Sequence, residues 1–441
     1  MLFTLKHGFV LAALSLQATA FPFALEANEK IGLPTPSPLE ALSKARGNCG
    51  NIPCLTFDEK DQFVSTTGEH AYASPLPGQI RGPCPGLNAA ANHGYLPRSG
   101  VATILQTVDG LGQSFGMGPV LSAFLAAYGV LMTGDPVLGT WSIGGAQPTN
   151  VLTKALLGQA QGISNSHNTY ETDMSIGRKD AYINNGDAHS LDIKQFTQAY
   201  EWGVKDGSDR YTLDKFAQDF RNKGAQSIAT NPYFFSAPFS GVLVAPAAYM
   251  FVINLMSNHS AEEPNGWLDG EMFKTFFAVE GQYPNFKWLP GQERIPERWY
   301  RRPSTQMYDA ANVNSDVAIQ YTAYPDSFKL GGNANGVNSY AGVKLEDLTG
   351  GVMAMDSLFD PANPKAVCFM AQFTQALIPD AAGGLLGALS PVTKAVNGLI
   401  SSSIKPLAAG FDCPIVSRFD QSLFNKFPGQ KYSPTSKSTT Y

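Results

Sequence analysis

The hydrophobic positions of this chain recur mostly at the spacing of an α-helix. Two clear runs are Val101, Ile104, Leu105 and Val108, and then Val120, Leu121, Phe124, Leu125 and Tyr128. Thr212 precedes a third run, which the stop signal Lys223-Gly224 ends, and Asp269 precedes a fourth. Alternating strand patterns are short and rare, and the 30 prolines and 43 glycines suit long turns. The pattern predicts an all-α fold in one large multi-helix domain.

One apolar stretch approaches the length of a membrane span. No Asp, Glu, Lys, Arg or His lies between Lys223 and His259, and residues 237–256 are largely hydrophobic. Pro238, Pro246 and Asn254 interrupt the stretch and would be costly in lipid. We therefore predict a buried helix here and no membrane partner.

The two ends of the chain differ in composition from the rest. Lys6 and His7 precede a short apolar run, and Ala18 and Ala20 end it at the spacing of a signal-peptidase site. The run is too short for a membrane anchor, so residues 1–20 are predicted to be a secretory signal and the protein to be extracellular. Residues 428–441 are rich in Ser and Thr and are predicted to be a disordered tail, which leaves 21–427 as the folded domain.

The composition limits the possible partners. Hydrophobic residues make up 44% of the chain and charged residues 15%, so a large core can form beneath a lightly charged surface. The net charge is −5 and there is no cluster of Lys or Arg, which argues against binding to nucleic acid or to anionic membranes. A small or uncharged substrate is favoured, and the oligomeric state stays open.

Five cysteines in a secreted chain leave at least one outside intramolecular pairing. Cys49 and Cys54 are close enough to close a small loop, and Cys368 and Cys413 flank the last helical stretch. Cys84 is then the thiol without a partner.

Cys84 lies between two prolines in the sequence RGPCPG. If it caps a helix, Pro85 occupies the first helical position and the amides of Gly86 and Leu87 point at the sulfur. Such amides favour an anion, so we expect a lowered thiol pKa and a thiolate suited to a soft metal or a heme iron. The alternative is a buried cysteine that acts as a small hydrophobic residue.

The longer segment from Arg81 to Gly100, RGPCPGLNAAANHGYLPRSG, resembles the proximal motif of the fungal heme-thiolate peroxidases, the family of chloroperoxidase and the unspecific (aromatic) peroxygenases. The resemblance implies a chloroperoxidase-like domain that binds heme b, with Cys84 as the axial ligand. His93 is interpreted as a structural histidine within the motif.

A second segment, HNTYETDMSIGRKDAYINNGD, resembles the motif that holds Mg²⁺ beside a heme propionate in this family. The resemblance implies that Glu171 supplies a carboxylate, Thr172 its carbonyl and Ser175 its hydroxyl. Tyr170 corresponds to an aromatic residue of the pocket wall. Without the first motif, the same residues would be a polar turn with Asp173 capping a helix. Residues 227–232 and 293–302 resemble further family segments, and Cys368 with Cys413 resembles the C-terminal disulfide.

The sequence departs from the family at the residues that move protons for peroxide. The family uses a glutamate, helped by an arginine or histidine, but Ser240 falls at the arginine position and Ala247 at the glutamate position. Downstream carboxylates could fold back over the heme, although solvent exposure is the simpler expectation: Glu262, Glu263, Asp269 and Glu280. We therefore expect slow peroxide activation, a different oxidant, or a substrate that brings its own proton donor.

Two function classes follow. The first is a secreted oxidoreductase that uses hydrogen peroxide on a small aromatic substrate, in a pocket predicted to be lined by Phe239, Val242, Tyr249 and Phe251. The second is a heme protein without peroxidase activity, such as a carrier, a sensor, an isomerase or a dehydratase. No motif supports a hydrolase, a zinc site or a dinucleotide site. Asn258 begins a glycosylation sequon.

Overall fold

The computed structural model describes residues 47–50, 53–377 and 390–431. The predicted signal at 1–20 and the end of the predicted tail, 432–441, lie outside these residues. Pro428–Lys431 forms a 3₁₀ helix, η9, and Gly429 packs so closely on the backbone of Tyr233 that no side chain would fit there. The described helical structure thus extends to Lys431, four residues past the predicted boundary at 427.

Helices dominate the structure, which confirms the all-α prediction. The α-helices are α3 (Glu59–Gln62), α4 (Pro85–Asn92), α5 (Ile104–Phe115), α6 (Pro119–Met132), α7 (Val151–Leu157), α8 (Ile193–Val204), α9 (Leu213–Thr230), α10 (Ala245–Leu255), α11 (Gly270–Phe276), α12 (Ala310–Ala323), α13 (Leu345–Thr349), α14 (Met355–Leu358), α15 (Ala366–Leu377), α17 (Ser390–Leu399) and α18 (Lys405–Ala408). Two π-helical turns, η4 (Ser240–Val244) and η7 (Ile400–Ile404), precede α10 and α18.

The strands are short and pair only in small antiparallel ribbons. They are β1 (Val101–Thr103), β2 (Thr140–Ser142), β3 (Phe235–Ser236), β4 (Val279–Gln282), β5 (Asn285–Trp288), β6 (Gly331–Asn333) and β7 (Tyr340–Gly342). β1 pairs with β2, β4 pairs with β5, and β6 lies between β3 and β7. These ribbons join segments that lie between the helices.

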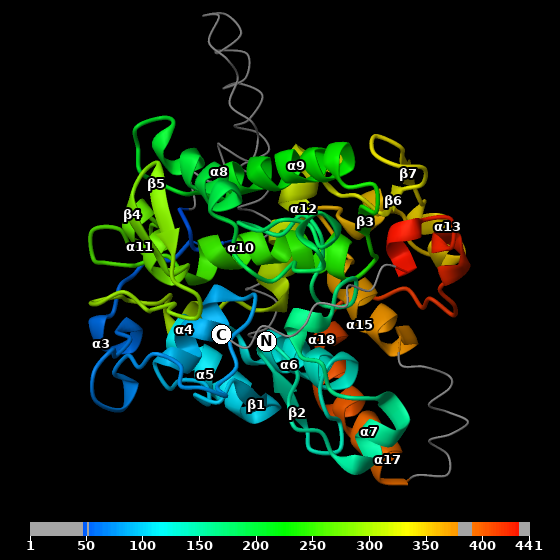
Figure 1. Cartoon of the computed structure of the whole chain (residues 1–441), viewed down its shortest axis with the longest axis horizontal. Coiled ribbons are helices and arrows are strands. Elements are labelled where there is room, and N and C mark those ends of the chain that lie inside the picture. The colour runs from blue at the N-terminus through cyan, green and yellow to red at the C-terminus, as the bar shows by residue number, and fades with distance from the viewer. Residues whose placement is uncertain (1–46, 51–52, 378–389, 432–441) are drawn as a thin grey trace, which may run out of the picture.

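Helix α10 runs through the middle of the molecule. In Figure 1, α8 and α9 lie above it and α4, α5 and α6 lie below it, while α12 also packs on it. Most side chains of α10 are buried, as the absence of charged residues from this stretch predicts. Among the described helices, none combines the length and the apolar character that a bilayer crossing needs.

The predicted capping residues begin helices as expected, but two boundaries differ from the prediction. Thr212 and Asp269 cap α9 and α11 through their side chains. Val101 lies in strand β1, and Thr103 caps the helix that follows. Helix α9 continues past Lys223-Gly224 to Thr230. A Cβ at Gly224 would lie against a methionine sulfur of a neighbouring segment, so this glycine allows close packing within the helix and does not mark its end.

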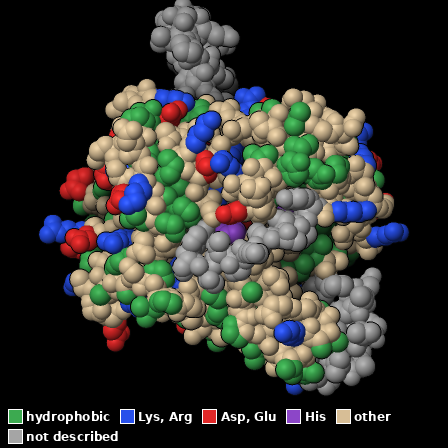
Figure 2. Space-filling view, in the orientation of Figure 1, with side chains coloured by type: hydrophobic (Ala, Val, Ile, Leu, Met, Phe, Trp, Pro, Cys, Tyr) green, Lys and Arg blue, Asp and Glu red, His purple; other side chains and the backbone are tan. Residues whose placement is uncertain are grey.

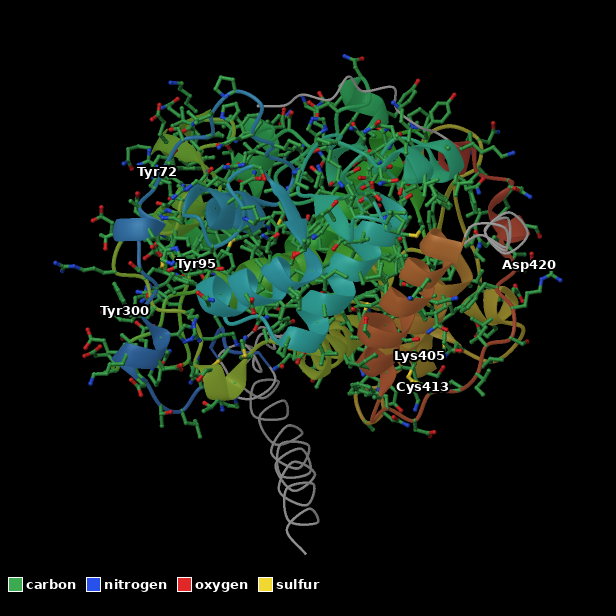
Figure 3. All side chains as sticks on the ribbon, turned by 90° about the horizontal axis from the view of Figure 1, so that it is seen from below. Tyr72, Tyr95, Tyr300, Lys405, Cys413 and Asp420 are labelled. Carbon is green, nitrogen blue, oxygen red and sulfur yellow. A yellow bond between two sulfur atoms is a disulfide. The ribbon has the colours of Figure 1, made fainter. Side chains whose placement is uncertain are left out.

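The described cysteines divide as the sequence suggests. Cys49 is paired with Cys54, Cys368 is paired with Cys413, and Cys84 is free. The second disulfide ties Cys413, which follows α18 and is labelled in Figure 3, to α15. On the face shown in Figure 2, basic and acidic side chains are interspersed among polar and apolar ones.

Candidate active site around Cys84

Cys84 lies at the N-terminus of α4 and opens into a cavity. It occupies the N-cap position with extended backbone angles, and Pro85 follows at the first helical position, as the sequence predicts. The side chain is half-buried and lines the cavity. The sulfur therefore faces an internal space from a rigid helix start.

The pKa of Cys84 is raised, whereas the sequence analysis predicts that it is lowered. Burial raises the pKa of the Cys84 thiol above its ordinary value, and the amides of Leu87 and Gly86 and the charge of Arg178 only partly counteract it. The amides lie where the sequence predicts, but the apolar surroundings outweigh them. The thiol is therefore protonated until a metal displaces its proton.

Hydrogen bonds fix the loop that carries Cys84. The side chain of Asn88 donates to the carbonyl of Gly82 at 2.8 Å and accepts from the amide of Gly82 at 2.9 Å. The buried guanidinium of Arg81 donates to Asn92 Oδ1 at 2.7 Å. A Cβ at Gly82 would lie 2.1 Å from the carbonyl oxygen of Ile143, so only glycine fits. The motif residues thus position the thiol.

The cavity next to Cys84 is almost entirely apolar. It lies between the start of α4, helices α5 and α6, the segment 163–178, and the π-turn η4 with α10. Its unfilled space is about 1280 Å³, part of which opens to solvent. Among the described residues that line it, the side chains that can ionise are Cys84, Tyr170, Glu171 and Arg178. Such a cavity suits a large flat apolar group with one or two polar anchors.

Three oxygen atoms converge at one edge of this cavity. The Ser175 hydroxyl donates to the carbonyl of Thr172 at 2.8 Å and lies 3.5 Å from Glu171 Oε1. All three residues line the cavity. The structure therefore brings together the carboxylate, carbonyl and hydroxyl that the sequence indicates.

His167 is a functional candidate that the sequence analysis did not identify. Its Nδ1 lies 2.8 Å from Glu171 Oε2, and its Nε2 lies 3.7 Å from Asp173 Oδ1. Burial alone would lower the pKa of His167, but the charge of Asp173 and the bond to Glu171 outweigh it and raise the pKa to about 9. His167 therefore engages one oxygen of Glu171 and leaves Oε1 facing Ser175.

Arg178 is a second residue that the sequence analysis missed. It lines the cavity and donates to the carbonyl of Pro83, one residue before Cys84. This bond ties the segment that carries Glu171 to the loop that carries the thiol. The position of Arg178 in the quoted second motif is the signal that could have drawn attention to it.

Apart from Glu171, no Asp or Glu side chain of the described residues lines the cavity. Ala247 lines the cavity, as the sequence alignment expects, whereas Ser240 is buried beside it and its hydroxyl has no hydrogen-bond partner within the described part of the chain. The downstream carboxylates lie elsewhere: Glu262, Glu263 and Glu280 are exposed, and Asp269 caps α11.

Of the four residues predicted to line the cavity, two do so in the structure. Phe239 and Phe251 line the cavity, but Val242 and Tyr249 do not. Within helix α10 the cavity meets the face that carries Ala247 and Phe251, so Tyr249, two residues before Phe251, faces the other side and donates to the carbonyl of Met174 at 3.1 Å. Leu243 and Val244 line the cavity instead of Val242.

Tyr170 lies in the cavity wall, as predicted. Its hydroxyl makes a weak hydrogen bond of 3.3 Å to the carbonyl of Leu125, and its ring stacks parallel to Trp141 and edge-on to Tyr128. Burial raises the pKa of Tyr170, so the phenol stays neutral and can donate. Its hydroxyl hydrogen is therefore weakly held at the wall of the cavity.

Comparison with known proteins agrees with this geometry. Residues 70–304 match the model of the family described as "Peroxidase, family 2". The chain is 37% identical to the dothistromin biosynthesis peroxidase dotB of Dothistroma septosporum, over 85% of this chain and 88% of that protein. It is 33% identical to the aromatic peroxidase fscJ of Fusarium equiseti, over 96% and 97% of the two chains. An aromatic peroxygenase of Coprinellus radians is 34% identical over 59% of this chain and 89% of its own.

Proposed function

Because this chain belongs to peroxidase family 2 and is a peroxide-dependent oxidoreductase, we propose that it binds heme b through the Cys84 thiolate and oxidises a small aromatic compound in the cavity. The family implies heme. The observation that carries the proposal is the free Cys84 thiol at a helix start, facing a cavity with apolar walls.

The residues of the cavity fit a heme. Cys84 is the soft donor that would hold a heme iron, and α5, α6 and α10 would offer apolar side chains to the macrocycle. Heme, when bound, supplies the iron at which peroxide is reduced. The amides of Gly86 and Leu87 then stabilise the negative charge of the bound sulfur, and the apolar walls keep water from the reacting groups.

We also propose that Glu171, Thr172 and Ser175 hold a Mg²⁺ ion. Their oxygens suit a hard cation, which would keep waters at its remaining positions. His167 supports this site, since it binds Glu171 Oε2 and thereby orients Oε1 towards Ser175.

The acid and base that moves a proton from one oxygen of the peroxide to the other must be a group other than a glutamate at position 247. Removal of a positioned acid and base costs roughly 10²- to 10⁴-fold in rate. We propose that the Tyr170 hydroxyl hydrogen-bonds the peroxide, and that an acidic hydroxyl of the aromatic substrate gives a proton to the oxygen that leaves as water and takes back the proton of the other oxygen. The substrate class is accordingly a phenol or a hydroxylated polycyclic compound, of the kind that secondary metabolism produces.

Secretion remains part of the proposal, on the composition of residues 1–20. We do not extend it to a glycan at Asn258. That side chain is half-buried and accepts a hydrogen bond of 2.8 Å from the amide of Tyr300.

The experiment compares two substrates of nearly equal size, a naphthol and its methyl ether, with hydrogen peroxide and the heme-loaded protein. We expect turnover of the naphthol and much slower turnover of the ether, because the ether cannot supply a proton. The Cys84→Ala variant should lose heme and both reactions. Equal rates for the two compounds would show that the proton has another source, and no turnover of either compound by heme-loaded protein would contradict the proposed reaction.

A further inference from the structure

Three side chains that can bind a metal meet at a place outside the lining of the Cys84 cavity. Cys49 and Cys54 come from the start of the folded domain, and His259 follows α10. Their sulfur and ring nitrogen atoms all lie within 4.8 Å of one another, and the three residues are fully buried. Among the described residues, no other group of three or more His, Cys, Asp or Glu side chains brings its donor atoms this close.

The orientation of His259 is that of a metal ligand. Its Nδ1 lies 2.9 Å from the carbonyl oxygen of Pro264, which can only accept, so Nδ1 carries the hydrogen. A ligating histidine commonly donates its second ring nitrogen to a backbone carbonyl in this way. Nε2 is buried and has no hydrogen-bond partner in the described parts of the chain. Its lone pair is therefore free to bind a cation.

The surrounding residues hold these three side chains in place. Gly266 lies against the imidazole, and a Cβ there would come within 2.6 Å of the ring. Arg302 donates to the carbonyl of Cys49 at 2.9 Å, and the side chain of Asn48 donates to Ser257 Oγ at 2.8 Å. The backbone of Cys49 is thus held against the loop that carries the histidine, and after reduction the two sulfurs need to move apart only at their side chains to bind one cation.

In the structure the two cysteines form a disulfide. Reduction by a phosphine or a thiol supplies two electrons and two protons, breaks the sulfur–sulfur bond and gives two thiols. A divalent cation then binds both sulfurs as thiolates and releases the two protons. We propose that Cys49, Cys54 and His259 form a zinc site in the dithiol form of this protein.

The donor set favours zinc among divalent cations. Two thiolates and an imidazole are soft and borderline ligands, which select zinc over magnesium or calcium. The two thiolates carry two negative charges, which neutralise the divalent ion. Neutralisation matters here because the site is buried and Arg302 already contributes a positive charge. The proposal does not depend on heme or on peroxide chemistry.

His93 provides a matched comparison. It is also buried, its Nδ1 also lies against a backbone carbonyl, at 2.8 Å from His70, and its Nε2 also lacks a partner within the described residues. No second metal-binding side chain accompanies it in a group of the kind that His259 joins. The two sulfurs near His259 therefore distinguish a ligand from an ordinary buried histidine.

The test uses the heme-loaded protein, reduced anaerobically with a phosphine, incubated with zinc and freed of excess metal. Elemental analysis should give about one zinc per chain beyond the amount in the unreduced protein, which reports zinc held at oxygen sites. Zinc-edge X-ray absorption should show two sulfur neighbours at about 2.3 Å and a nitrogen at about 2.0 Å. No additional zinc, or zinc with only oxygen and nitrogen neighbours, would overturn the proposal.

Two histidine variants assign the site. His259→Gln should bind zinc at least about tenfold more weakly, while His93→Gln should bind it as the unmodified protein does. Equal zinc affinity in His259→Gln would also overturn the proposal, since the reduced cysteines would then bind zinc without this ligand. If His259→Gln does not retain heme, Cys49→Ser replaces it, and the same loss of zinc and of sulfur neighbours is expected.

Discussion

Replacement of Gly82 by alanine tests whether the loop before Cys84 must be rigid. Gly82 lies two residues before the thiol, where the backbone passes directly over Ile143 and Gly144. A Cβ would lie 2.1 Å from the Ile143 oxygen and 2.5 Å from the Gly144 Cα. Both atoms belong to backbone, so no side chain can rotate to make room. The loop must move by about 1 Å to restore ordinary contact distances.

Overpacking of this kind costs about 1–3 kcal/mol, and we expect the upper end for Gly82→Ala because backbone meets backbone. The shift also carries Cys84 away from its position, so heme content per chain should fall. Gly398→Ala is the control, because that helical glycine has no atom within 4 Å of its added Cβ. It should raise the free energy of unfolding by about 0.5–1 kcal/mol.

Chemical denaturation gives the free energy of unfolding of each variant, and the Soret absorbance per chain gives the heme content. If Gly82→Ala unfolds like the unmodified protein and binds as much heme, then the close contact with Ile143 does not position Cys84 and the account of the loop is wrong. If Gly398→Ala lost as much stability as Gly82→Ala, the loss would instead reflect a general intolerance of this protein to replacement of glycine.

Three further changes have defined outcomes. Ala247→Glu should raise the peroxide-dependent rate roughly 10²- to 10⁴-fold, because it restores an acid and base in the cavity wall, and Ala247→Gln should not; an equal rise in both would refute the proton argument. Tyr170→Phe should raise the KM for peroxide roughly 2- to 10-fold through loss of one neutral hydrogen bond, and an unchanged KM would remove Tyr170 from the mechanism. Burial raises the pKa of Asp219 to about 6, so ionisation destabilises the folded state progressively from about pH 4 to pH 6 and fully above it. Asp219→Asn should therefore raise the free energy of unfolding by up to about 3 kcal/mol at pH 8 and hardly change it at pH 3, and equal effects at both pH values would contradict this assignment.

The local rules of the sequence predict the Cys84 loop well. A cysteine followed by proline starts helix α4, and the glycine and asparagine residues around it have the close contacts that a tight loop needs. The direction of the Cys84 pKa could not be predicted in this way. It depends on apolar side chains that α5, α6 and α10 bring from distant parts of the chain, and their desolvation outweighs the local amides.

The same limit applies to the cavity wall and to the buried histidines. The expected lining came from the resemblance and not from helical spacing, and Tyr249, two residues from Phe251 on the regular helix α10, lies off the face that meets the cavity. His167 meets Glu171 through an irregular segment with no helical period. His259 meets Cys49 only because the start of the domain folds back onto the loop after α10, a contact for which no spacing rule exists.

The claim on which the account depends is that Cys84 binds the heme iron as a thiolate. The most direct test is the absorption spectrum of the purified protein, ferric and then reduced under carbon monoxide, beside that of Cys84→Ala. The account predicts a red-shifted carbon monoxide band typical of thiolate ligation, lost in the variant. A protein that takes up no heme, or one whose carbon monoxide band is the same in Cys84→Ala, would contradict it.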